Sequence, residues 1–302
     1  MMAPEYYTFT GERVPDYVTH VRIAEALKFV PARAFYWHPN IEEVICHDGV
    51  VKIEREAFYS CPSLRRVIMP GVKEVERKAF NRCRRLTYIQ CGRLERIGEY
   101  AFIFCEFLSS IDLPSINSVG IYAFECCINL TNVKFGKDLE SIGTGVFLSC
   151  ASLERITLPL KDRMIAFDNE FQGCDSLHHV DLAGGVHESV AALLLEEWKN
   201  DMNDKIDSIN RILPNTPAGD WYAEGRISWE IRTWIRSVLH KYNNYKADHR
   251  RYLRVAAAAL QPALPNDIVL KNIFPFIELP SFRGELGGTT HWAIYGPHDS
   301  VP

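Results

Sequence analysis

The stretch ERKAFNRCRRL, Glu76–Leu86, combines an Ala-Phe pair, a cysteine three residues after the phenylalanine, and a leucine three residues after the cysteine. This combination recurs at intervals of 22 to 24 residues. The pair occupies Ala34-Phe35, Ala57-Phe58, Ala79-Phe80, Ala101-Phe102 and Ala123-Phe124, followed by the altered copies Val146-Phe147 and Glu170-Phe171. The cysteine position holds Cys61, Cys83, Cys105, Cys127, Cys150 and Cys174, with His38 in the first copy. A fixed period of this length is typical of solenoid repeat proteins.

Each copy also contains two short apolar segments that suit β-strands. The first has the spacing L-x-x-[IV], as in Leu64–Val67, and the second precedes the Ala-Phe pair, as in Val72–Val75. A proline or glycine ends the first segment in several copies, and proline cannot donate a hydrogen bond to a β-ladder. Because neither segment can bury its apolar side alone, the copies must stack on one another. The sequence therefore predicts a parallel β-solenoid with two short strands per repeat over residues 16–185.

The repeat resembles that of BspA-like leucine-rich repeat proteins, a type first described in Treponema pallidum. The resemblance rests on the order L-x-x-I-x-L-P, V-x-x-I and A-F-x-x-C-x-x-L, as in LSSIDLPSINSVGIYAFECCINL at residues 108–130. It implies a curved leucine-rich-repeat solenoid of parallel strands that is used for binding. The copy KDRMIAFDNEFQGC at residues 161–174 departs from the pattern through an insertion and the loss of the V-x-x-I pair. The geometry of that coil is therefore expected to differ.

Residues that flank the inward positions of the first strand should face outward in two columns, because side chains alternate along a strand. One column comprises His20, Glu43, Arg66, Tyr88, Ser110, Asn132, Arg155 and His179. Its neighbour comprises Arg22, Ile45, Ile68, Gln90, Asp112, Lys134, Thr157 and Asp181. Core packing does not fix these residues, so we expect them to bind a partner, which we expect to be another protein. The alternative is a solvated sheet face that binds nothing.

Beyond Gly184-Gly185 the apolar residues change to helical spacing, which predicts a helix over residues 188–213. Pro214 and Pro217 end it, and a second helix is expected from about Arg226. The apolar seam of the second helix contains Ile231, Ile235, Val238, Tyr242, Tyr245, His249, Tyr252 and Ala256. With a short linker between them, the two helices are expected to form an antiparallel hairpin over residues 186–262.

The charges of the two helices are complementary. Residues 188–213 contain six acidic and three basic residues, whereas residues 224–260 contain three acidic and eight basic residues. The region resembles the helical tail of BspA-like repeat families that have expanded in diatoms. Residues 263–282 are expected to form a short helix or capping segment over an apolar surface, and residues 283–302 are expected to be a disordered tail.

Motifs of known chemistry are absent from the sequence. There is no P-loop, G-x-S-x-G, H-E-x-x-H or C-x-x-C sequence, so we expect no catalysis and no cofactor. His179 and Asp181 share one strand face, but two ligands do not make a metal site. Cys83 lies among arginines that would favour a reactive thiolate. Its place in the repeat instead predicts a buried, reduced and unreactive thiol.

Two further classes of function stay open at this point. Residues 65–96 contain ten basic and three acidic residues in a chain of net charge −4, which raises nucleic-acid or other polyanion binding as an alternative. The seam position of the aromatic residues and the acidic partner helix argue against a basic binding face on the second helix. The start of the chain lacks the pattern of a signal peptide, and no apolar run approaches 18 residues. These features favour an intracellular protein over a surface adhesin.

Overall fold

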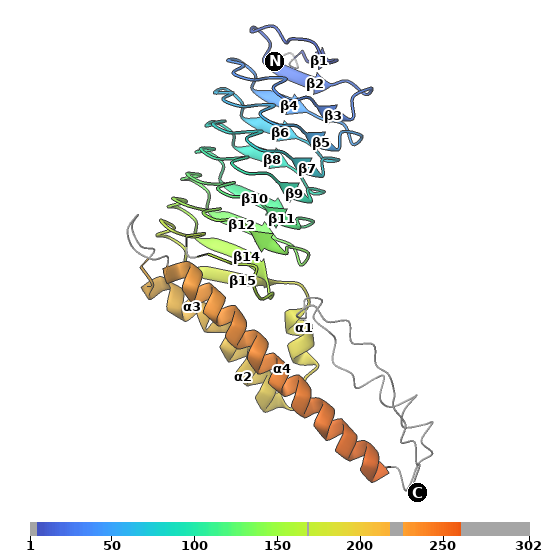
Figure 1. The fold of residues 1–302 in the computed structure, drawn as a ribbon, viewed down its shortest axis with the longest axis vertical. Helices are drawn as coiled ribbons and strands as arrows, with labels where there is room; N and C mark the ends of the chain where they lie inside the picture. The colour runs from blue at the N-terminus through green and yellow to red at the C-terminus, as the bar shows by residue number, and fades with distance from the viewer. Residues whose placement is uncertain (1–4, 168, 218–225, 261–302) are drawn as a thin grey trace, which may run out of the picture.

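The computed structural model describes residues 5–167, 169–217 and 226–260. The chain winds through a stack of coils and then enters a helical region at the end of the stack (Figure 1). The strands are β1 (Tyr7–Phe9), β2 (His20–Ile23), β3 (Phe29–Val30), β4 (Glu43–Ile45), β5 (Lys52–Ile53), β6 (Arg66–Ile68), β7 (Glu74–Val75), β8 (Tyr88–Gln90), β9 (Arg96–Ile97), β10 (Ser110–Leu113), β11 (Ser118–Val119), β12 (Asn132–Phe135), β13 (Ser141–Ile142), β14 (Arg155–Pro159) and β15 (His179–Ala183). The helices are α1 (Val186–Ala191), α2 (Glu196–Asp207), α3 (Ile209–Ile212), the 3₁₀ helix η1 (Leu213–Asn215) and α4 (Arg226–Leu260).

The strands form parallel sheets on two sides of the coils. The longer strands form two sheets, in the orders β1-β2-β4-β6-β8 and β10-β12-β14-β15. The two-residue strands form one sheet in the order β13-β11-β9-β7-β5-β3. The coils from β2 to β13 each contain two short parallel strands, which confirms the predicted leucine-rich-repeat solenoid. In the coil of β14 no second strand is present among the described residues, so the altered copy at residues 161–174 does differ from the others. The solenoid also begins earlier than the predicted residue 16, because β1 (Tyr7–Phe9) adds a strand that pairs with β2.

A ladder of phenylalanine rings fills the centre of the stack. The rings of the Ala-Phe positions lie face to face, with centroids 4.8 to 5.7 Å apart and interplanar angles of 4° to 14°. All seven rings are buried: Phe35, Phe58, Phe80, Phe102, Phe124, Phe147 and Phe171. Each ring packs against the rings of the neighbouring coils, so the ladder joins the coils through their core.

The cysteine column binds each coil to the one before it. Each thiol donates a hydrogen bond of 3.0 to 3.3 Å to a phenylalanine carbonyl oxygen of the preceding coil, as Cys83 does to Phe58. Burial raises the pKa of Cys83 well above its usual range, despite the arginines beside it in the sequence. Cys83 therefore behaves as a small core residue with a weak donor, as the repeat predicts.

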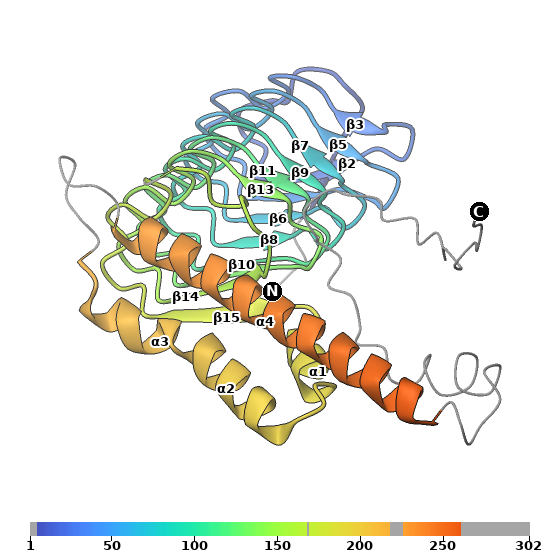
Figure 2. The same cartoon turned by 60° about the horizontal axis from the view of Figure 1, so that its bottom comes forward.

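The helical region differs from the prediction in its first half. The expected helix over residues 188–213 is interrupted between α1 and α2, because the chain turns to bury Leu193 and leaves Leu194 46% exposed. α2 and α3 then run antiparallel to α4 (Figures 1 and 2), so the predicted hairpin is present. On α4 the seam residues from Ile231 to His249 are buried except for Tyr245, which is partly buried, and Tyr252 is 53% exposed. The predicted segments 263–282 and 283–302 lie outside the described residues.

The helices close the last coil by imitating the coil that would follow. The side-chain amide of Asn210 on α3 accepts a hydrogen bond from the Val180 backbone N–H at 2.8 Å and donates one to the Val180 carbonyl oxygen at 3.3 Å. The Phe147 N–H donates to the Glu170 carbonyl oxygen of the next coil, whereas the Phe171 N–H donates to the Ser228 hydroxyl of α4 at 3.3 Å. The helices lie against the last coil (Figure 2), and their polar side chains thus satisfy backbone groups at the end of the stack.

Replacement of Asn210 by alanine should destabilise the protein by about 2 to 4 kcal/mol, because two backbone groups of Val180 lose their partners in a partly buried site. Urea unfolding followed by circular dichroism measures the change. Asn215→Ala is the matched control, since Asn215 is exposed and bonds only within its own helix end. Equal unfolding of the two variants would show that Asn210 does not cap the sheet.

Replacement of Glu170 by glutamine should stabilise the protein at pH 7. Burial raises the pKa of Glu170 more than the Phe167 N–H and Arg232 lower it. The folded state therefore holds the proton more tightly than the unfolded state, and stability is lost as the pH rises through the folded pKa. The melting temperature of Glu170→Gln should exceed that of the wild type by more at pH 7 than at pH 4, while the exposed Glu188→Gln should show no such trend. A constant difference across this range would contradict the assignment.

Thiol labelling of the native protein should modify one cysteine of nine. Cys126 is half-buried and the other eight are buried. Burial also raises the pKa of Cys126, so its labelling near neutral pH should be slow. Mass spectrometry after alkylation should locate the label on Cys126, and Cys126→Ser should abolish it. Rapid labelling of Cys83 in the native protein would disprove the buried column.

Candidate functional site

The strand register places the predicted outward residues in two straight columns. His20, Glu43, Arg66 and Tyr88 are direct neighbours on β2, β4, β6 and β8. In the second sheet the same alignment holds for Ser110, Asn132, Arg155 and His179. The neighbouring column is aligned in the same way: Arg22, Ile45, Ile68 and Gln90 in the first sheet, and Asp112, Lys134, Thr157 and Asp181 in the second. We call these two columns the strand face. It has an N-terminal and a C-terminal half, since β8 and β10 belong to different sheets.

Arginine and aromatic side chains hold one another in place on the N-terminal half. The Arg66 guanidinium lies 3.0 Å from a carboxylate oxygen of Glu43 and 4.8 Å from the ring centre of Tyr88. Arg22 lies 5.1 Å from the ring centre of Tyr6, whose hydroxyl donates to Glu43. That hydrogen bond, together with burial, raises the pKa of the Tyr6 hydroxyl. The side chains are therefore ordered before any partner arrives.

A partly apolar strip runs beside this cluster. Ile45 and Ile68 of the second column are half-buried, and Tyr88 is 46% exposed. An exposed ring, an arginine and two isoleucines at one place form the kind of surface that contributes most of the binding energy in protein interfaces.

The C-terminal half is more polar. Arg155 lies 3.0 Å from one carboxylate oxygen of Asp181, and the His179 ring nitrogen lies 3.0 Å from the other. Among the described residues, no group of three or more His, Cys, Asp or Glu side chains could hold a metal ion. Between the halves, Gln90, Ser110, Asp112 and Lys134 are exposed.

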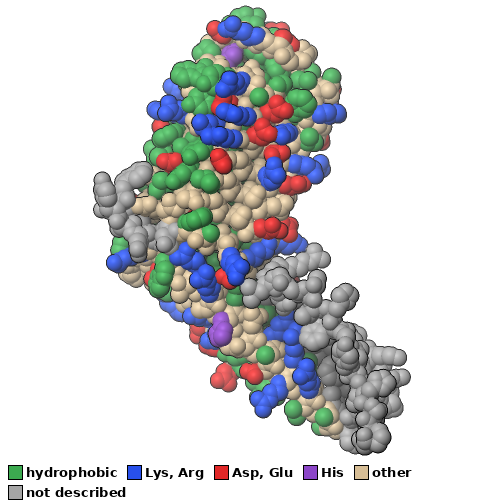
Figure 3. All heavy atoms as spheres, viewed as in Figure 1, with side chains coloured by type: hydrophobic (Ala, Val, Ile, Leu, Met, Phe, Trp, Pro, Cys, Tyr) green, Lys and Arg blue, Asp and Glu red, His purple; other side chains and the backbone are tan. Residues whose placement is uncertain are grey.

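Half of the ten basic side chains of residues 65–96 lie within 4 Å of a carboxylate. Lys73 lies 2.9 Å from Glu95 and Arg84 lies 3.4 Å from Glu106. Arg96 contacts Glu74 of the coil before it. Each of these pairs joins residues 22 apart, so the repeat itself places them side by side. Positive and negative side chains are interspersed over the N-terminal coils in Figure 3.

Sequence reasoning missed a second set of rings beside the Ala-Phe positions, which are exposed or half-buried. Tyr36 and Tyr59, which directly follow the core phenylalanines, stack with centroids 5.0 Å apart. Tyr100 and Tyr122, which directly precede the alanines, stack at 5.5 Å. Trp37 is 60% exposed. Alignment of the repeats by the columns next to Ala-Phe, and not only by the strand columns, would have shown these pairs.

Within the described part of the chain, the model contains no helix with the length and apolar character required to cross a membrane.

Known structures with similar coils come from several bacteria. The leucine-rich repeat protein of Treponema pallidum is 28% identical over 48% of this chain and 74% of its own, with a TM-score of 0.43. A leucine-rich repeat protein of Bacteroides ovatus is 17% identical over 55% of both chains, with a TM-score of 0.33. A leucine-rich cell surface protein of Faecalibacterium prausnitzii is 17% identical over 59% of this chain and 90% of its own, with a TM-score of 0.25. No curated protein matches the sequence.

The family comparison agrees with the repeat seen in the coordinates. The model of the BspA type leucine-rich repeat region, which spans six copies, matches residues 28–118 and 95–192. These residues make up more than half of the chain and include most of the solenoid, whereas α2 to α4 lie beyond them. The chain therefore belongs to the BspA-type leucine-rich repeat family.

Proposed function

We propose that this protein is a non-enzymatic scaffold that binds another protein through its strand face, with the N-terminal half as the centre of the interface. The family membership supports a protein-interaction or adhesion-type scaffold in general terms. The choice of face rests on one observation: Arg66 and Tyr88 contact each other and lie beside Ile45 and Ile68.

The order of this cluster favours binding. A partner that packs on Tyr88 and Arg66 does not have to immobilise them, because Glu43 and the stacking contact already do so. A preordered side chain loses less entropy on association than a mobile one. The polar residues from Gln90 to Lys134 would then form the rim of the interface, where contacts contribute little energy.

Polyanion binding is the weaker alternative. A nucleic-acid surface needs cations that are free to meet phosphates, and several cations of residues 65–96 already face a carboxylate. Measurable nucleic-acid binding at low salt would revive this alternative. Adhesion outside the cell could use the same strand face and would be indicated by the location of the protein.

The site assignment predicts that Arg66→Ala and Tyr88→Ala together weaken partner binding by about 30-fold or more, since a single central Arg or Tyr residue contributes about 2 kcal/mol or more and the two contributions do not simply add. Affinity capture with mass spectrometry first identifies the partner, and calorimetry with the purified pair then measures the affinity. Addition of Arg155→Ala tests whether the interface extends to the C-terminal half.

The control for that experiment is the pair Arg84→Ala and Tyr100→Ala, which removes the same residue types from the Ala-Phe turns. Circular dichroism should show that both double variants remain folded, because the four side chains are at least partly exposed. Unchanged affinity of the strand-face variant, or equal losses in both variants, would contradict the proposed site.

A further inference from the structure

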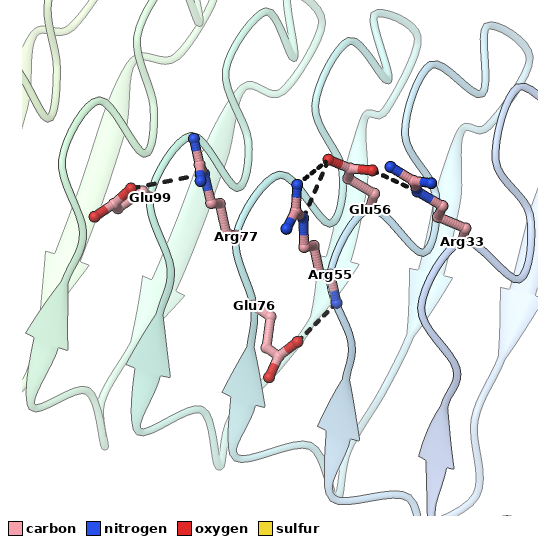
Figure 4. A network of polar contacts seen from close by, with 6 residues as sticks. All are labelled: Arg33, Arg55, Glu56, Glu76, Arg77 and Glu99. Carbon is pink, nitrogen blue, oxygen red and sulfur yellow. Dashed lines mark hydrogen bonds and ion pairs between the residues drawn. The ribbon is translucent and has the colours of Figure 1, made fainter.

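A charged cavity of about 260 Å³ lies on the side of the solenoid formed by the two-residue strands. Its charged lining consists of Arg55, Glu74, Glu76, Arg77 and Arg96, and Gly98 contributes to its wall. Glu74 lies on β7 and Arg96 on β9. Arg55, Glu76 and Arg77 lie on the segments that lead into the Ala-Phe turns (Figure 4). None of them belongs to the strand face, so the cavity is a separate place on the molecule.

Both carboxylates of the cavity already have two partners. Glu74 contacts Arg96 and lies 3.5 Å from the Lys52 ammonium. Glu76 lies 2.5 Å from Lys52 and accepts a hydrogen bond from the Arg55 backbone N–H at 2.8 Å. Burial raises the pKa of Glu76, but the hydrogen bonds and charges of these partners lower it overall. Glu76 is therefore ionised at neutral pH, and both carboxylates are already engaged by cations.

Arg77 is the least occupied cation of the cavity. Its Nε atom lies 3.7 Å from the Glu99 carboxylate, too far for a hydrogen bond, and both side chains are about half exposed. A pair in the adjacent column of the repeat, Arg33 and Glu56, is closed at 2.7 Å two coils earlier (Figure 4). The Arg77 guanidinium thus keeps donors for another group.

The charge and size of the cavity define what it can accept. Three guanidinium groups and two carboxylates line it, and Lys52, Glu56 and Glu99 add one positive and two negative charges against these groups. The ligand is therefore decided by the donors that Arg77 leaves open, and a single carboxylate matches the planar donor pair of an arginine. A phosphate dianion would bring twice that negative charge to Glu74 and Glu76. The volume is below that of sites for cofactors and other sizeable ligands, so it suits one side chain of a longer chain.

We infer that this cavity binds a glutamate or aspartate side chain of an acidic polypeptide segment, with Arg77 as the main contact. Such a contact gives the scaffold a second binding site, on the side formed by the two-residue strands and separate from the strand face. It does not depend on the strand-face proposal, because the two sites share no residue.

The test uses the full-length protein, labelled with ¹⁵N, and the peptide acetyl-GEGEG-amide. The peptide should shift the arginine side-chain N–H signal of Arg77 with a dissociation constant on the order of 1 mM. Arg77→Gln should weaken binding at least about tenfold, and Arg77→Lys, which keeps the charge without the planar fork, should give an intermediate loss. Arg84→Gln is the matched control, since Arg84 pairs with Glu106 elsewhere on the coils.

Two further ligands separate carboxylate recognition from other causes. The peptide acetyl-GQGQG-amide should produce no shift, and inorganic phosphate should compete weakly or not at all. Equal affinity of Arg77→Gln and the wild type, or equal binding of the Gln and Glu peptides, would overturn the inference. Tighter binding of phosphate than of the Glu peptide would overturn the assigned ligand class. None of these outcomes would bear on the strand-face proposal, which has its own test.

Discussion

Each coil depends on its neighbours for hydrogen bonds and for burial of its core residues. The Phe58 N–H donates to the Ala79 carbonyl oxygen of the next coil at 2.8 Å, and the Cys83 thiol donates back to the Phe58 carbonyl oxygen at 3.0 Å. Inside the coils, the Phe58 ring stacks on the Phe80 ring of the next coil. Because no coil can satisfy its backbone or bury its ring alone, the register is fixed for the whole stack. The outer surface inherits this register, so residues 22 or 23 apart become neighbours.

The same dependence creates a problem at the last coil, which has no successor. The helical region solves it with side chains that replace backbone groups: the Asn210 amide for a neighbouring strand and the Ser228 hydroxyl for an alanine carbonyl. Glu170 takes the place of the repeat alanine in this coil and is buried. Residues 161–174 therefore depart from the repeat because their coil packs against helices instead of against another coil.

The sequence allowed the solenoid, the strand columns and the cysteine column to be predicted, because each depends on a residue type repeated at a fixed period. Other features had no such signal. Two positions per coil adopt left-handed backbone angles, and in the third and fourth copies they are filled by Lys78, Arg82, Tyr100 and Phe104 instead of glycine. The break before α2 carries no proline or glycine. It depends on which leucine the solenoid end can bury, which only the tertiary structure decides.

The candidate sites likewise include a part that the sequence predicts and a part that it does not. The strand face could be placed from the sequence because strand alternation decides which side chains point outward. The proposed centre of the interface could not, because the proposal depends on the contact between Arg66 and Tyr88 and on the ion pair with Glu43. The charged cavity could not be predicted from the sequence for a related reason. Its arginines occur near or within a basic block, and the repeat offsets alone do not show which of them pair with a carboxylate. Arg77 lies 3.7 Å from Glu99, whereas Arg33 and Glu56 approach to hydrogen-bond distance. Only the three-dimensional structure shows this difference. In a repeat protein the period therefore decides which residues meet, and small differences between equivalent contacts decide which of them remain available to a partner.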